Sequence, residues 1–383
     1  MNSLDSIGVA PVIHDRAAAL ADAAKAHSDA SLQDYPLDYN AVHYSFAEKS
    51  IVPTYLTSPS SRQQVDTSQH FASVQGGDLA IFPAFGASMS YMRRRFACDI
   101  AAAGGLHVLP RVGLDEQRRL EDILYCGERG ADVAVSLGIR DSDAFLTQVL
   151  EQNHVHMLSV DIAHGANVAV IPLLLRLRDM GVSQGVILGN VGSVEGFVFA
   201  YWLMKLAGFA RFVIKVGIGP GSVCTTRINT GVGIGQYSVL EHLRSLRQQR
   251  DFSQAAIISD GGINNSGDFA KAIALSDGVM MAKYFSSASF EDEVLDYNAD
   301  GILRSIRLFG MASAHVPDKS RYIEGSEQHL PPLHHNAQEA VRKLKEGLQS
   351  AMTYVDALDL ASFRRKVRFA TNSAGTMVEN GVH

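Results

Sequence analysis

The sequence predicts an α/β protein whose strands close into one eight-stranded β/α barrel, the (β/α)8 or TIM-barrel class. From about residue 79, short apolar, β-branched segments alternate with helical patterns, eight such segments occur, and several end in small or polar residues. Near-continuous apolar runs are typical of parallel strands covered on both faces, and the helices between them supply the necessary crossovers. We therefore expect the active site at the carboxyl ends of the strands.

The expected elements follow one another in the order that such a barrel requires. The eight strands are expected at Leu79–Ala84, Leu106–Leu109, Asp132–Leu137, His156–Asp161, Gly185–Asn190, Phe212–Gly217, Ala256–Asp260 and Gly278–Ala282. Helices are expected at Ser90–Ala103, Asp115–Arg129, Ala166–Met180 and Ser238–Gln249. Several strands end in residues that suit chemistry at a barrel mouth, namely Asp161, Asn190, Gly217 and Asp260.

Segments outside this alternation set the limits of the expected domain. Residues 1–40 are an N-terminal extension whose Ala-rich segment, Arg16–Ala30, predicts a helix that is exposed or packed on a partner. The barrel domain is expected over residues 41–375, and residues 376–383 form a tail.

The last third of the domain contains a loop and a closing helix. Residues 315–335 hold three prolines and show no periodicity, so they predict a mobile loop, with His334 and His335 in solvent. The closing helix is expected to start at the N-cap Asn336, because Glu339 follows three residues later and apolar residues then recur on one face.

Composition favours one large globular domain and excludes several classes of protein. Of the 383 residues, 46% are hydrophobic and 19% are charged, and the net charge of -6 gives no reason to expect a nucleic-acid partner. No segment is apolar enough to span a membrane and no signal peptide is evident, so a cytoplasmic protein is expected. The three cysteines, Cys98, Cys126 and Cys224, lack the spacing of a zinc site or a disulfide framework.

The strongest local signal is the glycine-rich segment Lys215–Gly233, with the sequence KVGIGPGSVCTTRINTGVG. Its five glycines allow the backbone to approach a ligand or an ion closely. Cys224 lies beside threonines and Arg227, where positive charge and exposed amides favour a thiolate nucleophile. The alternative is a structural turn that holds an inert thiol, and we keep that interpretation for Cys98 and Cys126, which lie on expected helices.

A second signal is the Asp-Gly-Gly sequence at the end of the seventh expected strand. There the Asp260 carboxylate can accept both hydroxyls of a ribose, while Gly261 and Gly262 expose amides to a phosphate. An ordinary turn is the alternative interpretation of the same three residues.

The segment GIGPGSVCTTR, followed by TGVG, closely resembles the signature loop of the inosine monophosphate (IMP) dehydrogenase and guanosine monophosphate (GMP) reductase family. Further matches cover about residues 40–375 and occur in the order of the family. They are VDIAHGAN at 160–167, GNV at 189–191, SDGGINNSGDFAKA at 259–272, FGMAS at 309–313 and GLQSAMTYV at 347–355.

The resemblance implies a covalent mechanism. Cys224 would attack C2 of a purine nucleotide and form an adduct, while a hydride moves between C2 and a nicotinamide cofactor. Thr226 is similar to the threonine that helps to activate the leaving or attacking group, and Glu324 to the reductase glutamate that handles proton delivery to departing ammonia. The backbone carbonyls of Gly219, Gly221 and Cys224 resemble a monovalent-cation site, for which K+ is the expected ion.

The resemblance also implies which residues contact the ligands. A nucleotide monophosphate would be bound by Ser222, Asp260, Gly261, Gly262, Gly310, Met311, Asn190 and Lys283. Asp161 and Gly165 would contact the cofactor.

Two spacings resemble the reductase more than the dehydrogenase. Only 22 residues separate Leu109 from Asp132, which leaves no room for the regulatory CBS-domain pair that dehydrogenases usually carry there. Only twelve residues separate Met311 from Glu324, which is similar to the short reductase loop. The pair Arg321-Tyr322 is either an abbreviated dehydrogenase flap or part of an exposed loop.

Other positions depart from the family pattern. Lys283 follows the eighth expected strand, where glycine or serine amides usually face the phosphate, and it either contacts the phosphate as a point charge or fills that subsite. Phe309 stands where an aromatic hydroxyl often reaches the phosphate, and Pro83–Met89 replaces an alanine-rich loop that touches the base. The identity of the purine therefore stays open, a modified purine nucleotide included.

Three hypotheses follow from the resemblance. The first is a GMP reductase-like enzyme that reduces and deaminates GMP to IMP with NADPH. The second is an IMP dehydrogenase-like enzyme without the insert, which uses NAD and water to form xanthosine monophosphate. The third is a catalytically silent nucleotide-binding homologue, which the altered phosphate and base loops suggest. The resemblance also implies a homotetramer.

Overall fold

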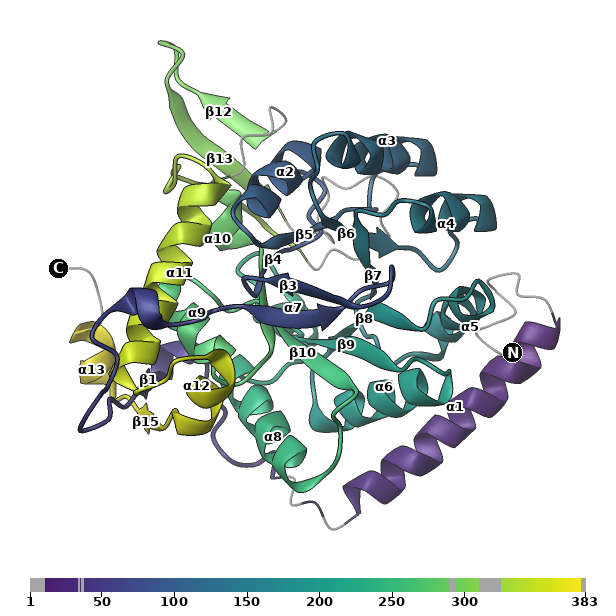
Figure 1. Cartoon of the computed structure of the whole chain (residues 1–383), viewed down its shortest axis with the longest axis horizontal. Helices are drawn as coiled ribbons and strands as arrows, with labels where there is room; N and C mark the ends of the chain where they lie inside the picture. The colour runs from purple at the N-terminus through teal and green to yellow at the C-terminus, as the bar shows by residue number, and fades with distance from the viewer. Residues whose placement is uncertain (1–10, 34, 36–37, 289–293, 310–324, 380–383) are drawn as a thin grey trace.

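A closed barrel of eight parallel strands forms the centre of the computed structural model, which describes residues 11–33, 35, 38–288, 294–309 and 325–379 (Figure 1). In barrel order the strands are β4 (Ala84–Gly86), β5 (Leu106–Leu109), β6 (Val133–Leu137), β7 (Val155–Asp161), β8 (Gln184–Val191), β9 (Arg211–Val216), β10 (Ala255–Asp260) and β11 (Gly278–Met281). Pairing of β11 with β4 closes the barrel. The expected fold class is confirmed.

The apolar runs of the sequence form this barrel because both faces of each strand are covered. All residues of β5, β6 and β11 are buried, since alternate side chains point into the barrel and toward the surrounding helices. Those helices are α2 (Arg94–Ala102), α3 (Glu116–Gly127), α4 (Asp143–Leu150), α5 (Ile171–Asp179), α6 (Val194–Leu206), α8 (Gln236–Gln249), α9 (Ser266–Ile273) and α10 (Lys283–Ser286).

The first barrel strand begins later than expected, so the assignment of Leu79–Ala84 to it was wrong. Residues Asp78–Ile81 (β3) instead pair in an antiparallel hairpin with Gln69–Ala72 (β2), outside the barrel. Pro83, which has no amide proton to donate, separates the hairpin from β4. The apolar run Leu79–Ala84 therefore contains most of β3 and the first residue of β4.

Helix boundaries also differ from those expected. The helix α2 begins four residues later than expected, at Arg94, and the expected helix at Ala166–Met180 starts with a 3-10 turn, Val168–Val170, before α5. The helices α4, α6 and α9 were not expected from the sequence. The residues of α6 are almost all apolar because this helix is covered on two sides, and they show no exposed polar face from which to detect it.

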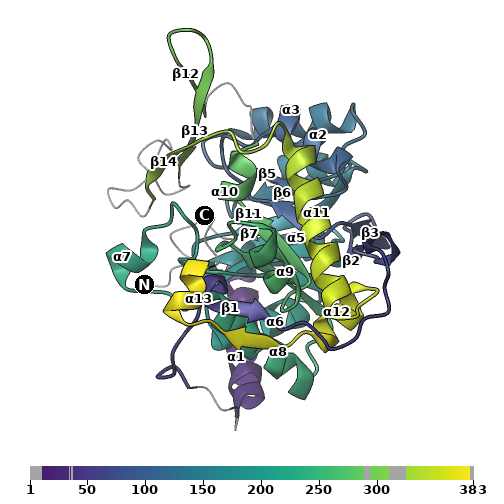
Figure 2. The same cartoon turned by 90° about the vertical axis from the view of Figure 1, so that its left-hand side faces the viewer.

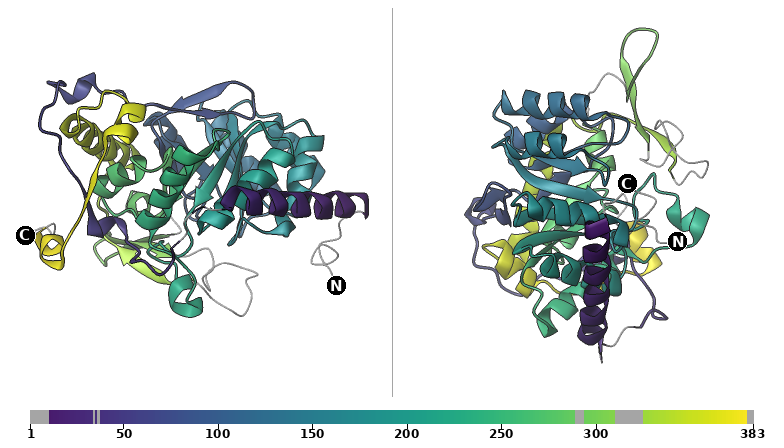
Figure 3. Two further views of the ribbon diagram at one scale, coloured as in Figure 1. Left: turned by 90° about the horizontal axis from the view of Figure 1, so that it is seen from below. Right: turned by 90° about the vertical axis from the view of Figure 1, so that its right-hand side faces the viewer.

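The outer cover of α6 is the N-terminal helix α1 (Pro11–Leu32), which lies along α5 and α6 (Figure 3). Ala17 and Ala24 are fully buried there, and the Trp202 indole donates to the Ser31 hydroxyl at 2.7 Å. The Ala-rich helix is therefore longer than expected, and it packs against its own chain because small alanine side chains permit close approach.

The C-terminal elements close the other side of the domain. They are α11 (Ala337–Tyr354), α12 (Leu360–Lys366), β15 (Phe369–Thr371) and α13 (Ala374–Glu379), and β15 pairs with β1 (Lys49–Ile51). Short 3-10 turns lie at Phe46–Glu48 and Arg62–Gln64. Asn336 caps α11 as expected, because its side chain accepts from the Glu339 amide at 2.8 Å.

A three-stranded antiparallel sheet, β12 (Leu295–Tyr297), β13 (Leu303–Phe309) and β14 (Glu327–Leu330), projects from the barrel (Figure 2). The strand β14 lies within the expected loop 315–335, so that part of the expectation was wrong. Its partner β13 is distant in sequence, and local periodicity carries no sign of such a pairing. Residues 315–324 lie outside the described residues.

His334 was expected in solvent but is buried, whereas His335 is exposed as expected. His334 is 8% exposed, with its ring centroid 4.8 Å from that of Tyr284. It is buried because the chain turns against α10 immediately before α11 begins. None of the described helices combines the length and the apolar character needed to cross a membrane.

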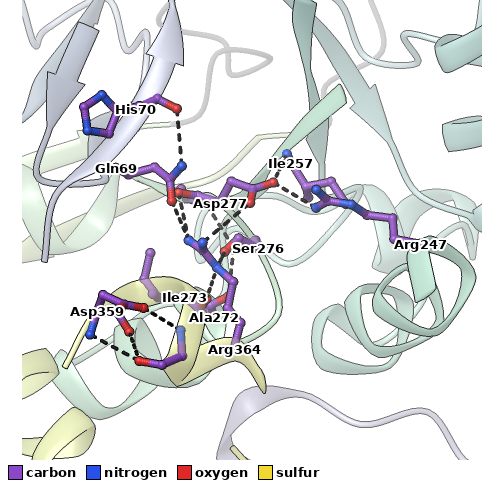
Figure 4. Close-up of polar contacts among 12 residues, drawn as sticks. Gln69, His70, Arg247, Ile257, Ala272, Ile273, Ser276, Asp277, Asp359 and Arg364 are labelled. Carbon is purple, nitrogen blue, oxygen red and sulfur yellow. Dashed lines mark hydrogen bonds and ion pairs between the residues drawn. The ribbon is translucent and has the colours of Figure 1, made fainter. Parts of the chain in front are cut away.

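A buried charge cluster joins four elements at the side of the barrel (Figure 4). The Asp277 carboxylate accepts from Arg247 of α8 at 2.9 Å and from the Ile257 amide at 2.8 Å. Arg364 of α12 donates to the Ser276 carbonyl at 2.8 Å and to the side chain of Gln69 in β2 at 2.9 Å. Burial alone would raise the pKa of Asp277, but the arginines and the amide lower it overall.

We expect Asp277→Asn to lower the free energy of unfolding by about 3 kcal/mol at neutral pH, because it leaves two partly buried arginines, Arg247 and Arg364, without their counter-charge. The pKa of Asp277 is depressed in the folded state. Its contribution is therefore complete above the unfolded-state value of about 3.9 and is lost as the pH falls through the lower folded-state pKa. Urea unfolding of both proteins should give a difference that shrinks toward pH 2. The exposed Asp300→Asn is the control, and a difference independent of pH would contradict this expectation.

Candidate active site

The carboxyl ends of the barrel strands surround a cavity of about 540 Å³. All eight strands contribute lining residues, either from the strand or from the loop that follows it. This is the face of a β/α barrel where backbone amides and side chains of separate loops converge.

Most residues implicated by the sequence line this one cavity. They are Cys224, Thr226, Ser222, Asp260, Gly261, Gly262, Asn190, Lys283, Asp161, Gly219 and Gly221. Gly165 does not line it. A Cβ atom there would lie 2.8 Å from the backbone of Gly189, so this glycine permits close packing of two loops. Glu324, Gly310 and Met311 lie outside the described residues.

The loop after β9 holds Cys224 half-buried at the cavity wall. The Cys224 thiol donates to the Thr226 hydroxyl, with Sγ and Oγ1 3.1 Å apart. Thr226 opens the short helix α7 (Thr226–Thr230), which ends at Gly231 in the left-handed region, φ 72°. The other two cysteines lie elsewhere: Cys98 on α2, and Cys126 on α3, where burial raises the pKa of the thiol.

Close backbone approach fixes the start of this loop. Gly217 has a φ of 153°, and a Cβ atom there would lie 2.1 Å from the Asp260 carbonyl oxygen. Only glycine fits this position without movement of β10. The cysteine loop and the Asp-Gly-Gly turn are thereby held against each other.

The Arg227 side chain packs against the backbone of the same loop. A Cβ atom at Gly219 or at Gly233 would lie 2.6 Å from the Arg227 side chain, whose guanidinium donates to the Ile234 carbonyl. Burial lowers the pKa of Arg227, and the neighbouring Cys224 opposes that shift. The glycines of the motif thus make room for the Arg227 guanidinium close to the thiol.

The segment after residue 324 also supports the cysteine loop, which the sequence did not reveal. Gly325 forms a β-bridge with Cys224, and the Ser326 amide donates to the Val223 carbonyl at 2.9 Å. The Gln328 side chain donates to the Ser222 carbonyl at 2.9 Å. These contacts tie the cysteine loop to a second segment of the chain.

A line of charges crosses the floor of the cavity. The buried Lys215 ammonium lies 3.0 Å from Asp161 Oδ1 and 2.9 Å from Asp260 Oδ2. The Asn190 amide also donates to Asp260 Oδ2, at 2.8 Å. Burial lowers the pKa of Lys215, but the two carboxylates raise it more, so the ammonium stays charged. In the sequence, Lys215 is distinguished only as the single charged residue of the expected strand Phe212–Gly217.

Two further cations line the cavity. Arg111, which the sequence analysis did not single out, donates to the Asp161 carbonyl at 2.9 Å. Lys283 begins α10, and its ammonium has no carboxylate partner within the described part of the chain. Among the described residues, no group of three His, Cys, Asp or Glu side chains is placed to hold a metal ion.

We expect Gly217→Ala to destabilise the protein far more than Gly231→Ala. Both residues have positive φ, which costs an alanine about 1 kcal/mol, and Gly231 has open space around a new Cβ atom. At Gly217 the clash with the Asp260 carbonyl should add at least about 2 kcal/mol. Urea unfolding measures both losses, and equal losses would show that β10 moves aside freely.

Comparison with known proteins finds a family model and several similar proteins that match this chain. Residues 43–383 match the family model described as IMP dehydrogenase / GMP reductase domain. The GMP reductase of Bacillus subtilis (strain 168) is 30% identical over 308 residues, which is 79% of this chain and 89% of that protein. The GMP reductase of Streptococcus pyogenes serotype M1 is 29% identical over 79% of this chain and 88% of its own. That of Streptococcus gordonii is 28% identical over 70% and 77%.

Proposed function

Because the chain belongs to the IMP dehydrogenase / GMP reductase family, we propose that it is a purine-nucleotide oxidoreductase that reduces and deaminates GMP to IMP with NADPH. The observation that carries the proposal is the Cys224–Thr226 pair at the wall of the strand-end cavity, which the Asp-Gly-Gly turn also lines. The names of the relatives and the short spacing between Met311 and Glu324 support the reductase over the dehydrogenase.

In the proposed reaction the Cys224 sulfur attacks C2 of GMP, and the bond from C2 to the exocyclic nitrogen breaks. The product of this step is a thioimidate joined to the enzyme, and ammonia takes up the proton it needs from Glu324 and Thr226. Hydride then reaches C2 and the carbon–sulfur bond breaks, which releases IMP. The sum is GMP + NADPH + 2 H+ giving IMP + NADP+ + NH4+. Dividing one displacement into two steps lowers each barrier.

The chain's own residues suit these roles. The 3.1 Å contact keeps the Thr226 hydroxyl beside the reacting sulfur, where it can relay a proton. Arg227 packs against the same loop, so its guanidinium lies close to the sulfur that would attack. Asp260 Oδ1 has no hydrogen-bond partner among the described residues, so it is available to ribose hydroxyls.

The cofactor would bind beside Asp161, on the side of the cavity lined by Ser88, Arg111 and Val112. A carboxylate, a guanidinium and apolar side chains together fit a nicotinamide riboside. When bound, NADPH would supply the hydride; in the alternative, dehydrogenase-like reaction NAD would bind here and accept it.

A monovalent cation would bind to the carbonyls of Gly219, Gly221 and Cys224. This donor set consists of neutral backbone oxygens, which fit K+. A homotetramer remains the proposed assembly.

The first test of the function compares two mixtures in potassium buffer, GMP with NADPH and IMP with NAD, by the absorbance of the reduced nicotinamide. We expect loss of absorbance in the first mixture only. A gain in the second alone would indicate the dehydrogenase, and no change in either would favour a silent homologue. Cys224→Ala should lower the rate by at least about a thousandfold and still bind GMP, whereas Cys98→Ala, outside the cavity, should keep its rate.

Lys283 tests the phosphate subsite. If its ammonium contacts the phosphate, Lys283→Ala should raise the KM for GMP by about tenfold to a hundredfold with little change in kcat, as for loss of one charge-assisted hydrogen bond. Lys345→Ala, on the exposed face of α11, is the matched control. A lower KM in the Lys283 variant would mean that the side chain fills the subsite instead.

A further inference from the structure

We propose that Lys215 is a positioning residue that couples the nucleotide subsite to the cofactor subsite, so that binding of either ligand tightens binding of the other. The inference rests on the proposed function, because it takes Asp260 as the ribose acceptor and Asp161 as the cofactor acceptor.

The register of the barrel strands determines how Lys215 reaches Asp161. Asp161 of β7 lies opposite Gly189 of β8, and Gly189 lies opposite Lys215 of β9. The lysine therefore has to cross one whole strand to reach Asp161. It can do so because Gly189 has no side chain: a Cβ atom there would lie 2.6 Å from Lys215 Cβ and 3.3 Å from its Cε.

Two carboxylates share the one ammonium of Lys215. The Lys215 side chain is 3% exposed, whereas those of Asp161 and Asp260 are 23% and 20% exposed and line the cavity. The buried cation thus lies behind two carboxylates that ligands can reach. The position of the Lys215 ammonium depends on both carboxylates, because water has little access to a buried ammonium and cannot replace either partner.

The other hydrogen bonds of the two carboxylates leave Asp260 Oδ1 for a ligand. Lys215 and the Asn190 amide both bind Asp260 Oδ2, while the Ser88 hydroxyl donates to Asp161 Oδ2 at 3.0 Å. A ribose bound at Asp260 Oδ1 would fix that carboxylate, hence the ammonium, and hence Asp161. A second ligand then meets a site that is already ordered, which gives positive coupling.

The experiment measures binding to the full chain by calorimetry, with GMP alone, with NADP+ alone, and with each in the presence of the other. NADP+ has no hydride to donate, so the ternary complex cannot go on to IMP. In the wild type we expect each ligand to tighten the other at least about fivefold, by the same factor in both directions. In Lys215→Met the factor should fall close to one, and Lys215→Arg, which keeps a cation, should restore most of it.

A matched control separates coupling from loss of a buried lysine in general. Lys49 is 8% exposed and lies outside the cavity, so Lys49→Met should keep the wild-type factor. If Lys215→Met fails to fold by circular dichroism, Asp161→Asn carries the test, because a neutral amide holds the ammonium weakly and the factor should fall as well.

The possible failures are distinguishable. A wild type that binds GMP and NADP+ without mutual effect, or a Lys215→Met variant that keeps the wild-type factor, would overturn the coupling and leave the proposed function standing. A wild type that binds neither ligand would overturn both.

Discussion

The close approach of β9 and β10 at their carboxyl ends is the constraint on which the cavity depends. Gly217 leaves β9 directly against the Asp260 carbonyl, where no side chain fits. The cysteine loop therefore starts beside the Asp-Gly-Gly turn, and Cys224 faces the same cavity as Asp260. Glycine is needed here because it has no side chain, and not because the loop is flexible. Arg227 and residues 325–328 both contact the loop and hold it in place.

The same use of glycine recurs one strand away. Gly189 opens the path by which Lys215 reaches Asp161, and its neighbour Gly165 packs against it. Three strands thus share one buried charge network, Asp161–Lys215–Asp260, at the base of the cavity. A buried ammonium is tolerated because two carboxylates compensate it, and those carboxylates lie at the place where hydroxyl groups of ligands would bind.

Features far from the cavity support this arrangement through packing. The helix α1 covers α5 and α6, and α12 is anchored by Arg364 to the backbone that precedes β11. These contacts make the outer layer of the barrel thicker on two sides. They also explain why α6 can be apolar almost throughout, because most of its residues are buried and little of its surface is left for solvent.

The sequence by itself determined the barrel class, seven of its eight strands and the motif-bearing loops, because buried parallel strands are continuous apolar runs and glycine-rich turns are local signals. Tertiary structure decided the rest. It assigned Asp78–Ile81 to a hairpin, placed β14 against β13, buried His334 and brought α1 onto its own chain. It alone revealed Lys215 and Arg111 in the cavity, since which carboxylate a cation meets depends on the register of strands distant in the chain, and no local pattern records that register.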